Sequence, residues 1–251
     1  MKDPIVSIII ATYNSGETLR KALQSVQDQT YQYWECLIVD GASRDNTIEI
    51  VKEFASKDTR FRYISEPDKG IYDAFNKGWK NAKGEWIYYL GSDDRLTKEG
   101  LNELSKYIDS DVSFLSGDVY IQHIDGRRSL IKAKNGHPDF GYHQGMIMRK
   151  SVIAQFNGFD EKYKILADYD LLVRIIKSGG KMQLVDTCPI AFFAQGGTTS
   201  QLRTFINTIK DKYDIYKRYK YVRYPFISVC KYAYIKLRSI IYRRLRKYLN
   251  I

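Results

Sequence analysis

The chain has 251 residues, of which 44% are apolar and 27% are charged, and its formal net charge is +11. These values exclude an intrinsically disordered chain, and the length suits one large α/β domain or a core domain with an appendage. No stretch approaches the roughly 20 apolar residues of a spanning helix, which excludes an integral membrane fold. The three cysteines, Cys36, Cys188 and Cys230, form no CxxC pair, so neither a disulfide framework nor a cysteine zinc site is expected.

The N-terminal segment, MKDPIVSIIIATYN, has an apolar run that is too short for a signal peptide and no small-residue cleavage site. We therefore expect a reducing, cytoplasmic setting. The first 90 residues then alternate between two patterns. A continuous apolar run at residues 6–11 is typical of a strand buried on both faces. Residues 35–39, 61–65 and 85–90 are further strand candidates, and helical spacing follows each of the first three strands.

This alternation predicts a doubly wound α/β layer structure with right-handed crossovers. After residue 100 the pattern loosens. It predicts a helix near 98–109, strands near 112–123 and 128–133 on either side of the turn signal Asp125-Gly126, and a helix at about 168–178.

Polar segments follow each predicted strand: TYN, DGAS, EPDKG and GSDD. Ligands bind outside the carboxyl ends of strands in open α/β sheets, so these segments are expected to form one site. The chain has neither GxGxxG nor GxxxxGK[ST], which leaves a dinucleotide or P-loop site without its glycine cradle. Any diphosphate bound here needs another means of neutralisation.

Two acidic pairs are candidates for chemistry. Asp93 and Asp94 follow a buried strand and suit a hard divalent cation whose other positions go to water and phosphate oxygens, although an Asp cap for the 98–109 helix is the alternative. Asp168 and Asp170 begin the 168–178 helix. Asp168 suits a general base that takes a proton from an attacking hydroxyl, and a helix cap is again the alternative.

Several of these motifs together resemble the family 2 glycosyltransferases with the GT-A fold, a Rossmann-like mixed central sheet flanked by helices. The resemblance is carried by VSIIIATYNSGETLRKALQSVQDQTYQYWECLIVDGASRDNT, by EPDKGIYDAFNKGWKNAKGEWIYYLGSDD and by ADYDLLVRI, and it covers roughly residues 4–200. It implies inverting transfer of a sugar from a nucleotide-diphosphate sugar, most often a UDP-sugar, with Mg²⁺ or Mn²⁺.

The resemblance also implies roles for individual residues. The first nucleotide loop is matched by Thr12, Tyr13 and Asn14, and the carboxylate that reads uracil by Asp40. The wall of the nucleotide pocket is matched by Asp68, Lys69, Tyr72 and Asp73, the last Asp of the DXD metal motif by Asp93, and the base by Asp168.

Two positions depart from the family pattern. Gly91 stands where many members have the first Asp of DXD, so a ribose or metal contact there has to come from water, Ser92 or Asp94. Ala167 replaces a common Glu before the base, which leaves Asp168 intact but affects the acceptor site.

His143 and Gln144 follow the glycine-rich KNGHPDFGYHQG, which could form a loop over the cleft. The resemblance implies a place for them near the donor phosphates or the acceptor, and an ordinary buried His satisfied by the backbone is the alternative.

Residues 203–251 are expected to form a basic, Tyr-rich, amphipathic helical extension of a GT-A domain that spans 1–202. The extension holds 14 Lys and Arg against two Asp, a net charge of +12, and residues 1–202 have a net charge of −1. After Pro225 an apolar stripe recurs at helical spacing, with basic residues beside it. The stripe consists of Cys230, Tyr234, Leu237, Ile241, Leu245 and Tyr248. Such a helix either lies on an anionic membrane or packs its stripe on the protein body.

The resemblance therefore implies a metal-dependent, inverting glycosyltransferase of surface polysaccharide synthesis. Its partners would be a UDP-sugar, a saccharide acceptor that could be lipid-linked, and the inner face of a membrane. A non-catalytic protein that binds nucleotide sugars is one alternative. An RNA-binding protein is another, but it is less expected because no recognition module accompanies the basic tail.

Overall fold

The computed structural model describes residues 5–108, 111–134, 142–186, 188–194, 202–220 and 222–249, with all side chains in these ranges except 202, 203, 236 and 239–249. Its first half contains β1 (Val6–Thr12), α1 (Leu19–Gln27), β2 (Trp34–Asp40), α2 (Thr47–Lys57), β3 (Phe61–Ser65), α3 (Ile71–Asn81) and β4 (Trp86–Gly91). The expected strands agree with these to within one residue at each end.

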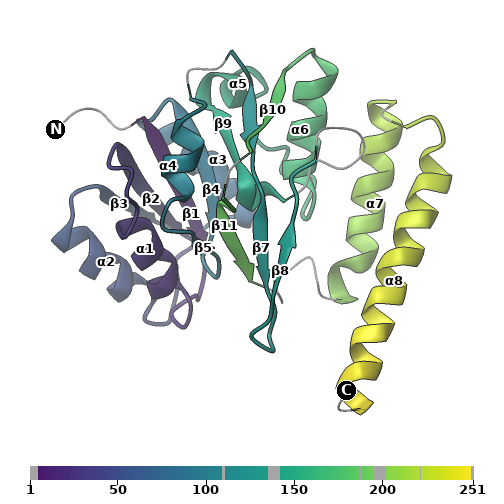
Figure 1. The fold of residues 1–251 in the computed structure, drawn as a ribbon, viewed down its shortest axis with the longest axis horizontal. Coiled ribbons are helices and arrows are strands. Elements are labelled where there is room, and N and C mark those ends of the chain that lie inside the picture. The colour runs from purple at the N-terminus through teal and green to yellow at the C-terminus, as the bar shows by residue number, and fades with distance from the viewer. Residues whose placement is uncertain are drawn as a thin grey trace.

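The second half is less regular, with short strands between helices (Figure 1). It contains β5 (Arg95–Leu96), α4 (Gly100–Ser105), β6 (Phe114–Ser116), β7 (Val119–Gln122), β8 (Arg128–Ile131), the 3₁₀ turn η1 (His143–Gly145), β9 (Met146–Arg149) and α5 (Lys150–Gln155). It continues with α6 (Ala167–Lys177), β10 (Met182–Leu184), β11 (Ala191–Ala194), α7 (Leu202–Arg218) and α8 (Pro225–Leu249).

The main sheet has seven strands in the order β10-β6-β9-β4-β1-β2-β3. β1 pairs in parallel with β2 and with β4, and β9 pairs antiparallel with both β4 and β6. The sheet is therefore mixed, which confirms the fold class expected from the sequence. A second sheet, with the order β5-β11-β7-β8, lies beside it.

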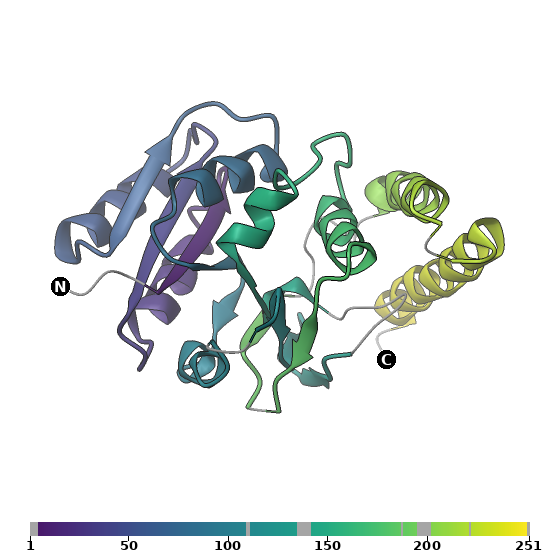
Figure 2. The same cartoon turned by 90° about the horizontal axis from the view of Figure 1, so that it is seen from above.

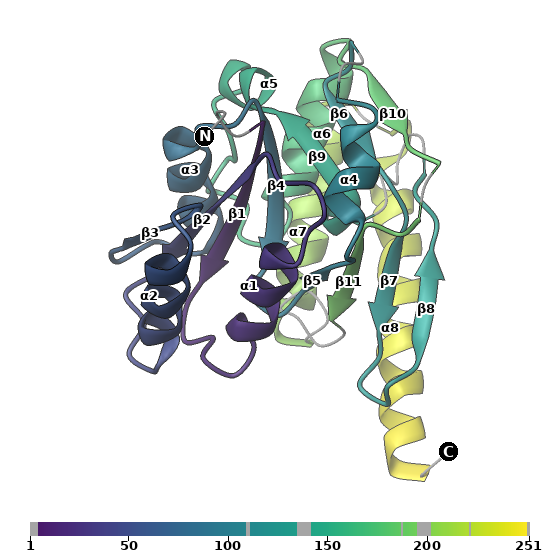
Figure 3. The same ribbon diagram turned by 60° about the vertical axis from the view of Figure 1, so that its left-hand side comes forward.

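The central strands β1, β2 and β4 are buried on both faces, which is why their sequences are mostly apolar. Ile8 and Ile10 of β1 belong to the core that α1, α2 and α4 cover, and Ile9 belongs to the core that α3 and α6 cover. All three side chains have no exposed surface. Alternate residues of one strand thus pack against two helical layers, and the loops that follow β1 and β4 lie at one end of the sheet (Figure 3).

Two sequence-based boundaries in the second half are wrong. The single strand expected near 112–123 is two strands, β6 and β7, in different sheets. Gly117 lies between them, and a Cβ there would come within 2.7 Å of Ile190 Cγ1, so a close approach of chains ends the strand. The helix expected over 98–109 is shorter and is limited to α4.

The basic extension is not a separate unit in its packing. Ile215 and Tyr216 of α7 are 0% and 2% exposed and belong to the same core as α3 and α6. α7 lies between α6 and α8, on the side of the molecule away from β3 (Figure 2). The boundary at 202–203 therefore marks a change in composition and not in packing. In the described ranges, no helix has the length and apolarity needed to cross a bilayer.

Candidate active site

The loops after β1 and β2 are joined by backbone and side-chain hydrogen bonds. Asn14 donates its N–H to Ser43 Oγ at 2.8 Å, and Asn14 Oδ1 accepts the N–H of Arg44 at 2.9 Å. Asn14 and Ala42 have φ angles of 49° and 61°, which are unusual for residues other than glycine. Such strained backbone persists where its surroundings hold it, and here both residues lie at the edge where a nucleotide was expected.

Tyr13 is the accessible aromatic residue of this edge, with 58% of its surface exposed. Its exposed ring is suited to stacking on a nucleotide base, and the role of Tyr13 in the nucleotide loop stays a prediction. The adjacent Thr12 is 4% exposed, and its Oγ1 has no hydrogen-bond partner among the described residues. Ser15 Oγ lies 3.0 Å from Ser92 Oγ, which joins the loop after β1 to the loop after β4.

Asp40 is fully buried at the end of β2. Its carboxylate accepts hydrogen bonds from the hydroxyl and N–H of Ser43 and, at 2.7 Å, from the hydroxyl of Ser65. The carboxylate thus holds the strained loop in place instead of presenting open oxygen atoms. A direct contact between Asp40 and uracil stays a prediction. In this structure the Ser43 hydroxyl, which is bonded to Asp40, contacts the loop after β1 by accepting the N–H of Asn14.

The EPDKG segment lies against the same edge. A Cβ on Gly41 would come within 2.6 Å of Asp68 Oδ2, so the Asp68 carboxylate lies close against the backbone at the end of β2. Asp68 Oδ1 accepts the N–H of Gly70 at 2.9 Å, and Asp73 Oδ2 accepts the N–H of Lys69 at 2.9 Å. These bonds shape the turn before α3. Lys69 itself is exposed.

Tyr72 lies elsewhere than expected. It is 8% exposed, and its hydroxyl is 2.7 Å from the carbonyl oxygen of Ile165 and 3.1 Å from Asp168 Oδ1. The structure therefore places Tyr72 against the candidate base and not in an open nucleotide wall.

The two aspartates after β4 differ in environment. Asp93 is exposed, whereas Asp94 is 2% exposed. Asp94 Oδ1 accepts the N–H of Ala194 at 2.8 Å, and Oδ2 accepts Nε2 of Gln144 at 3.1 Å. Neither aspartate caps α4, because the N-cap residue is Glu99.

The space beside Gly91 explains part of this arrangement. A Cβ at Gly91 would come within 2.6 Å of Asp94 Oδ2, so the Asp94 carboxylate fills the place that a longer side chain would need. Burial raises the pKa of Asp94 to about 6, the charge of Asp93 adds to the rise, and the bonds from Ala194 and Gln144 oppose it.

Asp93 is consequently the open carboxylate for a cation. Within the described ranges, no three His, Cys, Asp or Glu side chains gather closely enough to hold a metal ion alone. Mg²⁺ and Mn²⁺ suit such a sparse donor set, because Mg²⁺ commonly binds through one or two carboxylates, with the rest of its shell from water and substrate phosphates. The residues present fit the expected metal, with Asp94 behind Asp93 as a buried support.

Asp168 lies in the first turn of α6, and the N-cap residue is Leu166, so the cap alternative is wrong. Asp168 Oδ2 is 3.3 Å from His143 Nδ1, and Oδ1 accepts the N–H of Tyr169 at 2.8 Å. The side chain of Asp168 is 29% exposed and that of His143 is 37% exposed. The carboxylate is oriented by neighbours and still reaches solvent, as a general base requires.

The pKa values of this pair move in opposite directions. Burial alone would lower the pKa of His143, but the hydrogen bond to Asp168 and the carboxylate charges nearby raise it. Burial alone would raise the pKa of Asp168, but His143, the Tyr169 N–H and Tyr72 lower it. The raised pKa favours the protonated form of His143 beside the Asp168 carboxylate. His143 is therefore paired with the candidate base, and the alternative of a buried His satisfied by the backbone is wrong.

Neighbouring residues of η1 connect the two acidic groups. His143 contacts Asp168, and Gln144 contacts Asp94. The Asp93 charge also acts on His143, so Asp93 and Asp168, which are 75 positions apart in the chain, both lie near η1. Gln144 Oε1 is buried and has no hydrogen-bond partner among the described residues.

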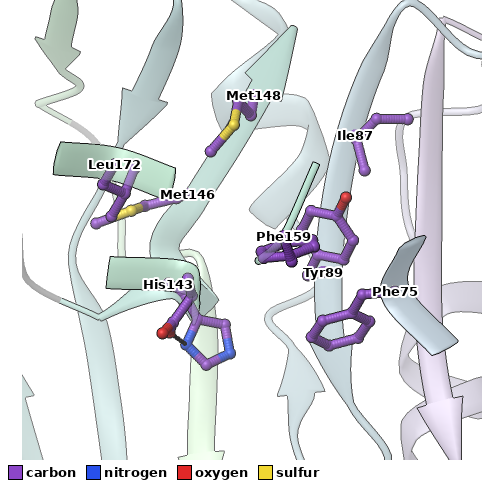
Figure 4. Close-up of a pocket in the computed structure, with 9 residues that line it drawn as sticks. Phe75, Ile87, Tyr89, His143, Met146, Met148, Phe159 and Leu172 are labelled. Atoms are coloured by element: carbon purple, nitrogen blue, oxygen red, sulfur yellow. Dashed lines mark ion pairs between the residues drawn. The ribbon is translucent and has the colours of Figure 1, made fainter. Parts of the chain in front are cut away.

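A small cavity of about 30 Å³ lies behind the pair (Figure 4). Its walls are apolar apart from His143, Asp168 and the hydroxyl of Tyr89. The Tyr89 hydroxyl is buried and has no hydrogen-bond partner in the described structure. The other lining residues are Phe75, Ile87, Met146, Met148, Phe159 and Leu172. This apolar wall accounts for the desolvation of Asp168.

Sequence reasoning missed Ser43, Tyr89 and the support from Asp170. Ser43 follows Asp40 by three residues, and this Asp-x-x-Ser spacing could have indicated a side-chain turn. Tyr89 lies in an apolar strand and gives no such signal. Asp170 is fully buried and pairs with Arg174 Nε at 2.8 Å, so it anchors α6 and does not face the ligand edge.

Comparison with known proteins identifies the family of the chain. Residues 7–169 match the family described as Glycosyl transferase family 2. The PGL/p-HBAD biosynthesis glycosyltransferase of Mycobacterium tuberculosis is 30% identical over 226 residues, which are 84% of this chain and 83% of that protein. The chondroitin synthase of Pasteurella multocida is 28% identical over 194 residues, which are 74% of this chain and 20% of that protein.

Two solved structures share the fold. S. aureus TarS 1-349 in complex with UDP-GlcNAc has a TM-score of 0.69 at 18% identity over 84% of this chain and 65% of that one. The mannosyltransferase PcManGT of Pyrobaculum calidifontis, in complex with GDP-Man and Mn²⁺, has a TM-score of 0.65 at 17% identity over 87% of this chain and 64% of that one. This chain thus spans less than two thirds of either structure. The likeness confirms the GT-A arrangement of the sheet and helices.

Proposed function

Because this chain belongs to glycosyl transferase family 2, we propose that it transfers a sugar from a nucleotide-diphosphate sugar that carries uridine to a hydroxyl group of a saccharide. The pathway would be polysaccharide or glycolipid synthesis, as in the named relatives. The observation that carries the proposal is the placement of Asp93 and Asp168 around η1, since one bound sugar carbon can then lie between them.

In the proposed reaction, Asp168 takes the proton of the acceptor hydroxyl as the oxygen attacks the anomeric carbon. The bond from that carbon to the diphosphate breaks on the opposite face, so the configuration inverts through an oxocarbenium-like state. His143 and Tyr72 hold the two oxygens of the Asp168 carboxylate, which fixes its direction before substrate arrives.

Asp93 would hold the divalent cation, which supplies charge stabilisation to the departing diphosphate. Tyr13 would stack on the base, and the loop held by Asp40 and Ser43 would border the ribose. Asp94 would keep the Asp93 turn in position through Ala194 and Gln144.

The test is nucleotide release from a panel of UDP- and GDP-sugars with Mn²⁺ and an acceptor panel. Asp168→Asn and Asp93→Asn should each lower the turnover by at least 100-fold, because each removes a group that acts on the reacting atoms. Asp125→Asn, on an exposed turn, is the matched control and should retain activity. Full activity of Asp168→Asn would refute the assignment of the base, and binding of the nucleotide sugar without turnover by the unaltered protein would favour the non-catalytic alternative.

We also propose that the acceptor is lipid-linked and that the enzyme acts at the inner face of a membrane. The support is the net charge of +12 in residues 203–251, beside a body of net charge −1. An acceptor panel that pairs each free saccharide with its lipid-linked form, presented in vesicles, tests this part. Equal kcat/KM for the two forms would refute it.

A further inference from the structure

The outer side of α8 carries a row of exposed apolar side chains. Phe226, Ile227, Tyr234 and Leu237 are 71%, 63%, 66% and 43% exposed. Cys230 is also exposed. Four of these residues, Phe226, Cys230, Tyr234 and Leu237, recur at steps of three and four, so they lie on one side of the helix. We call these five residues the α8 ridge.

The opposite side of α8 packs on the protein body. Val229 is 5% exposed, and the ring of Tyr232 lies 4.2 Å from Nζ of Lys212 on α7. The expected stripe therefore does not pack on the body where its side chains are described, at Cys230, Tyr234 and Leu237. Its members Ile241, Leu245 and Tyr248 lie outside the described side chains. Contiguous exposed apolar surface of this kind marks an interaction site.

The charge around the α8 ridge identifies the kind of partner. Residues 203–251 contain 14 Lys and Arg, and no Asp or Glu follows Asp214. Arg223, Lys231 and Arg238 are exposed within or beside the ridge. A second copy of the chain would bring the same positive charge against this one, which opposes pairing through the ridge. RNA would use the positive charge but not the aliphatic side chains.

We propose that the α8 ridge docks on an anionic lipid bilayer, with α8 lying in the plane of the headgroups. Apolar side chains would enter the headgroup boundary, and the basic residues would contact anionic lipids. This inference names the surface behind the membrane location in the proposed function, but it does not require the enzyme to be active.

The direction of α8 relative to the site supports this arrangement. α8 continues past the body on the side toward which the arrows of β1 and β4 point (Figures 1 and 3). That side carries the polar loops of the candidate active site. A docked α8 would therefore hold this edge beside the lipid surface, where a lipid-linked acceptor is presented.

Flotation with two kinds of vesicle tests the proposal. One kind contains phosphatidylcholine alone, and the other also contains about 30% phosphatidylglycerol, which makes its surface anionic. The variant Phe226→Ser/Ile227→Ser/Tyr234→Ser should bind the anionic vesicles at least tenfold more weakly than the unaltered protein. The matched control Tyr33→Ser/Ile124→Ser/Leu130→Ser removes three exposed apolar side chains away from α8 and should bind normally. Equal loss in both variants, or none in the first, would overturn the proposal, as would capture of RNA in preference to vesicles.

Cys230 provides a second readout that does not depend on affinity. An environment-sensitive nitrobenzoxadiazole label on Cys230, in a Cys188→Ser background, should shift to shorter wavelength when anionic vesicles are added. The same label on Cys188, in a Cys230→Ser background, should not shift, because Cys188 is exposed but lies outside α8. An unchanged spectrum at Cys230 would overturn the docking. Nucleotide release measured without vesicles reports the proposed activity separately, so failure of one does not imply failure of the other.

Discussion

At the scale of single residues, burial separates side chains that look equivalent in the sequence. Asp93 and Asp94 are adjacent, yet one is exposed and the other has both oxygens bonded to Gln144 and Ala194. The first is free to act on a ligand, and the second is part of the frame. The same holds for Asp168 and Asp170, of which only Asp168 reaches solvent.

Asp94→Asn should make the protein more stable at neutral pH. The folded-state pKa of Asp94 is raised from 3.8 to about 6, so its favourable contribution is present below pH 4 and is lost as the pH rises through 6. At about 1.4 kcal/mol per tenfold change in proton affinity, the loss is at most about 3 kcal/mol. An asparagine side chain does not ionise, so it loses no stability as the pH rises. Its Nδ2 can donate to Gln144 Oε1 once the Gln144 amide is flipped.

Urea unfolding in EDTA at pH 4 and pH 7.5 measures this. The free energy of unfolding of Asp94→Asn should exceed that of the unaltered protein at pH 7.5 by 1 to 3 kcal/mol, on the order set by the pKa, and should be close to it at pH 4. Asp93→Asn, at the exposed neighbour, should change stability little at either pH. A lower stability of Asp94→Asn at pH 7.5 would contradict the desolvation argument.

At the scale of helices and strands, the sequence predicts what local periodicity encodes. The sequence predicts β1, β2 and β4 because burial on both faces requires mostly apolar runs, and α6 because its apolar residues repeat at helical spacing. β6, β7 and β11 are short, and their pairing depends on partners distant in the chain, which periodicity does not report. α7 falls within the extension predicted to be helical, but the sequence does not predict its bounds or its packing, because basic residues interrupt its apolar positions.

The candidate site divides in the same way. Motif order gave Asp93, Asp168 and the loops of Tyr13 and Asp68, since all follow strands or begin a helix. Two contacts could not be predicted: Tyr72 lies against Asp168, and Asp40 is bonded inside its loop. Both depend on which side of the backbone faces the ligand edge, and residue spacing in the sequence does not report the direction of a side chain.

Gly78 in helix α3 tests whether core packing or helix propensity decides which residue is stable at this position. Gly78→Ala should gain about 1 kcal/mol of helix propensity, but its Cβ would come within 2.4 Å of Ile9 Cγ2 in the core. Overpacking of this kind costs about 1 to 3 kcal/mol, so we expect a net loss of about 1 kcal/mol in chemical denaturation.

Ile9→Leu serves as the partner change, because leucine has no branch at Cβ. In that background the same glycine substitution should be neutral or stabilising, and the double-mutant cycle should show a coupling energy of about 1 kcal/mol or more. Additive effects would mean that the contact between α3 and β1 does not limit the choice of residue at 78.

At the scale of the whole molecule, the two halves of the extension serve different purposes. α7 contributes Ile215 and Tyr216 to the core beside α6, and α8 contributes Val229 to the same core. The rest of α8 offers its exposed side to a partner. The extension is therefore structural on one side and available for binding on the other, which its composition alone does not reveal.

Two truncations separate these contributions. A chain that ends at residue 238 keeps Ile215, Tyr216 and Val229 and should unfold within a few degrees of the full chain in differential scanning calorimetry. A chain that ends at residue 202 loses all three buried side chains, each worth about 1.5 to 3 kcal/mol, against a total stability of about 5 to 15 kcal/mol for a typical protein. It should be largely unfolded or aggregated. A 1–202 chain with an unchanged melting temperature would show that the glycosyltransferase fold closes without α7, and the +12 extension would then be an appendage in packing as well as in charge.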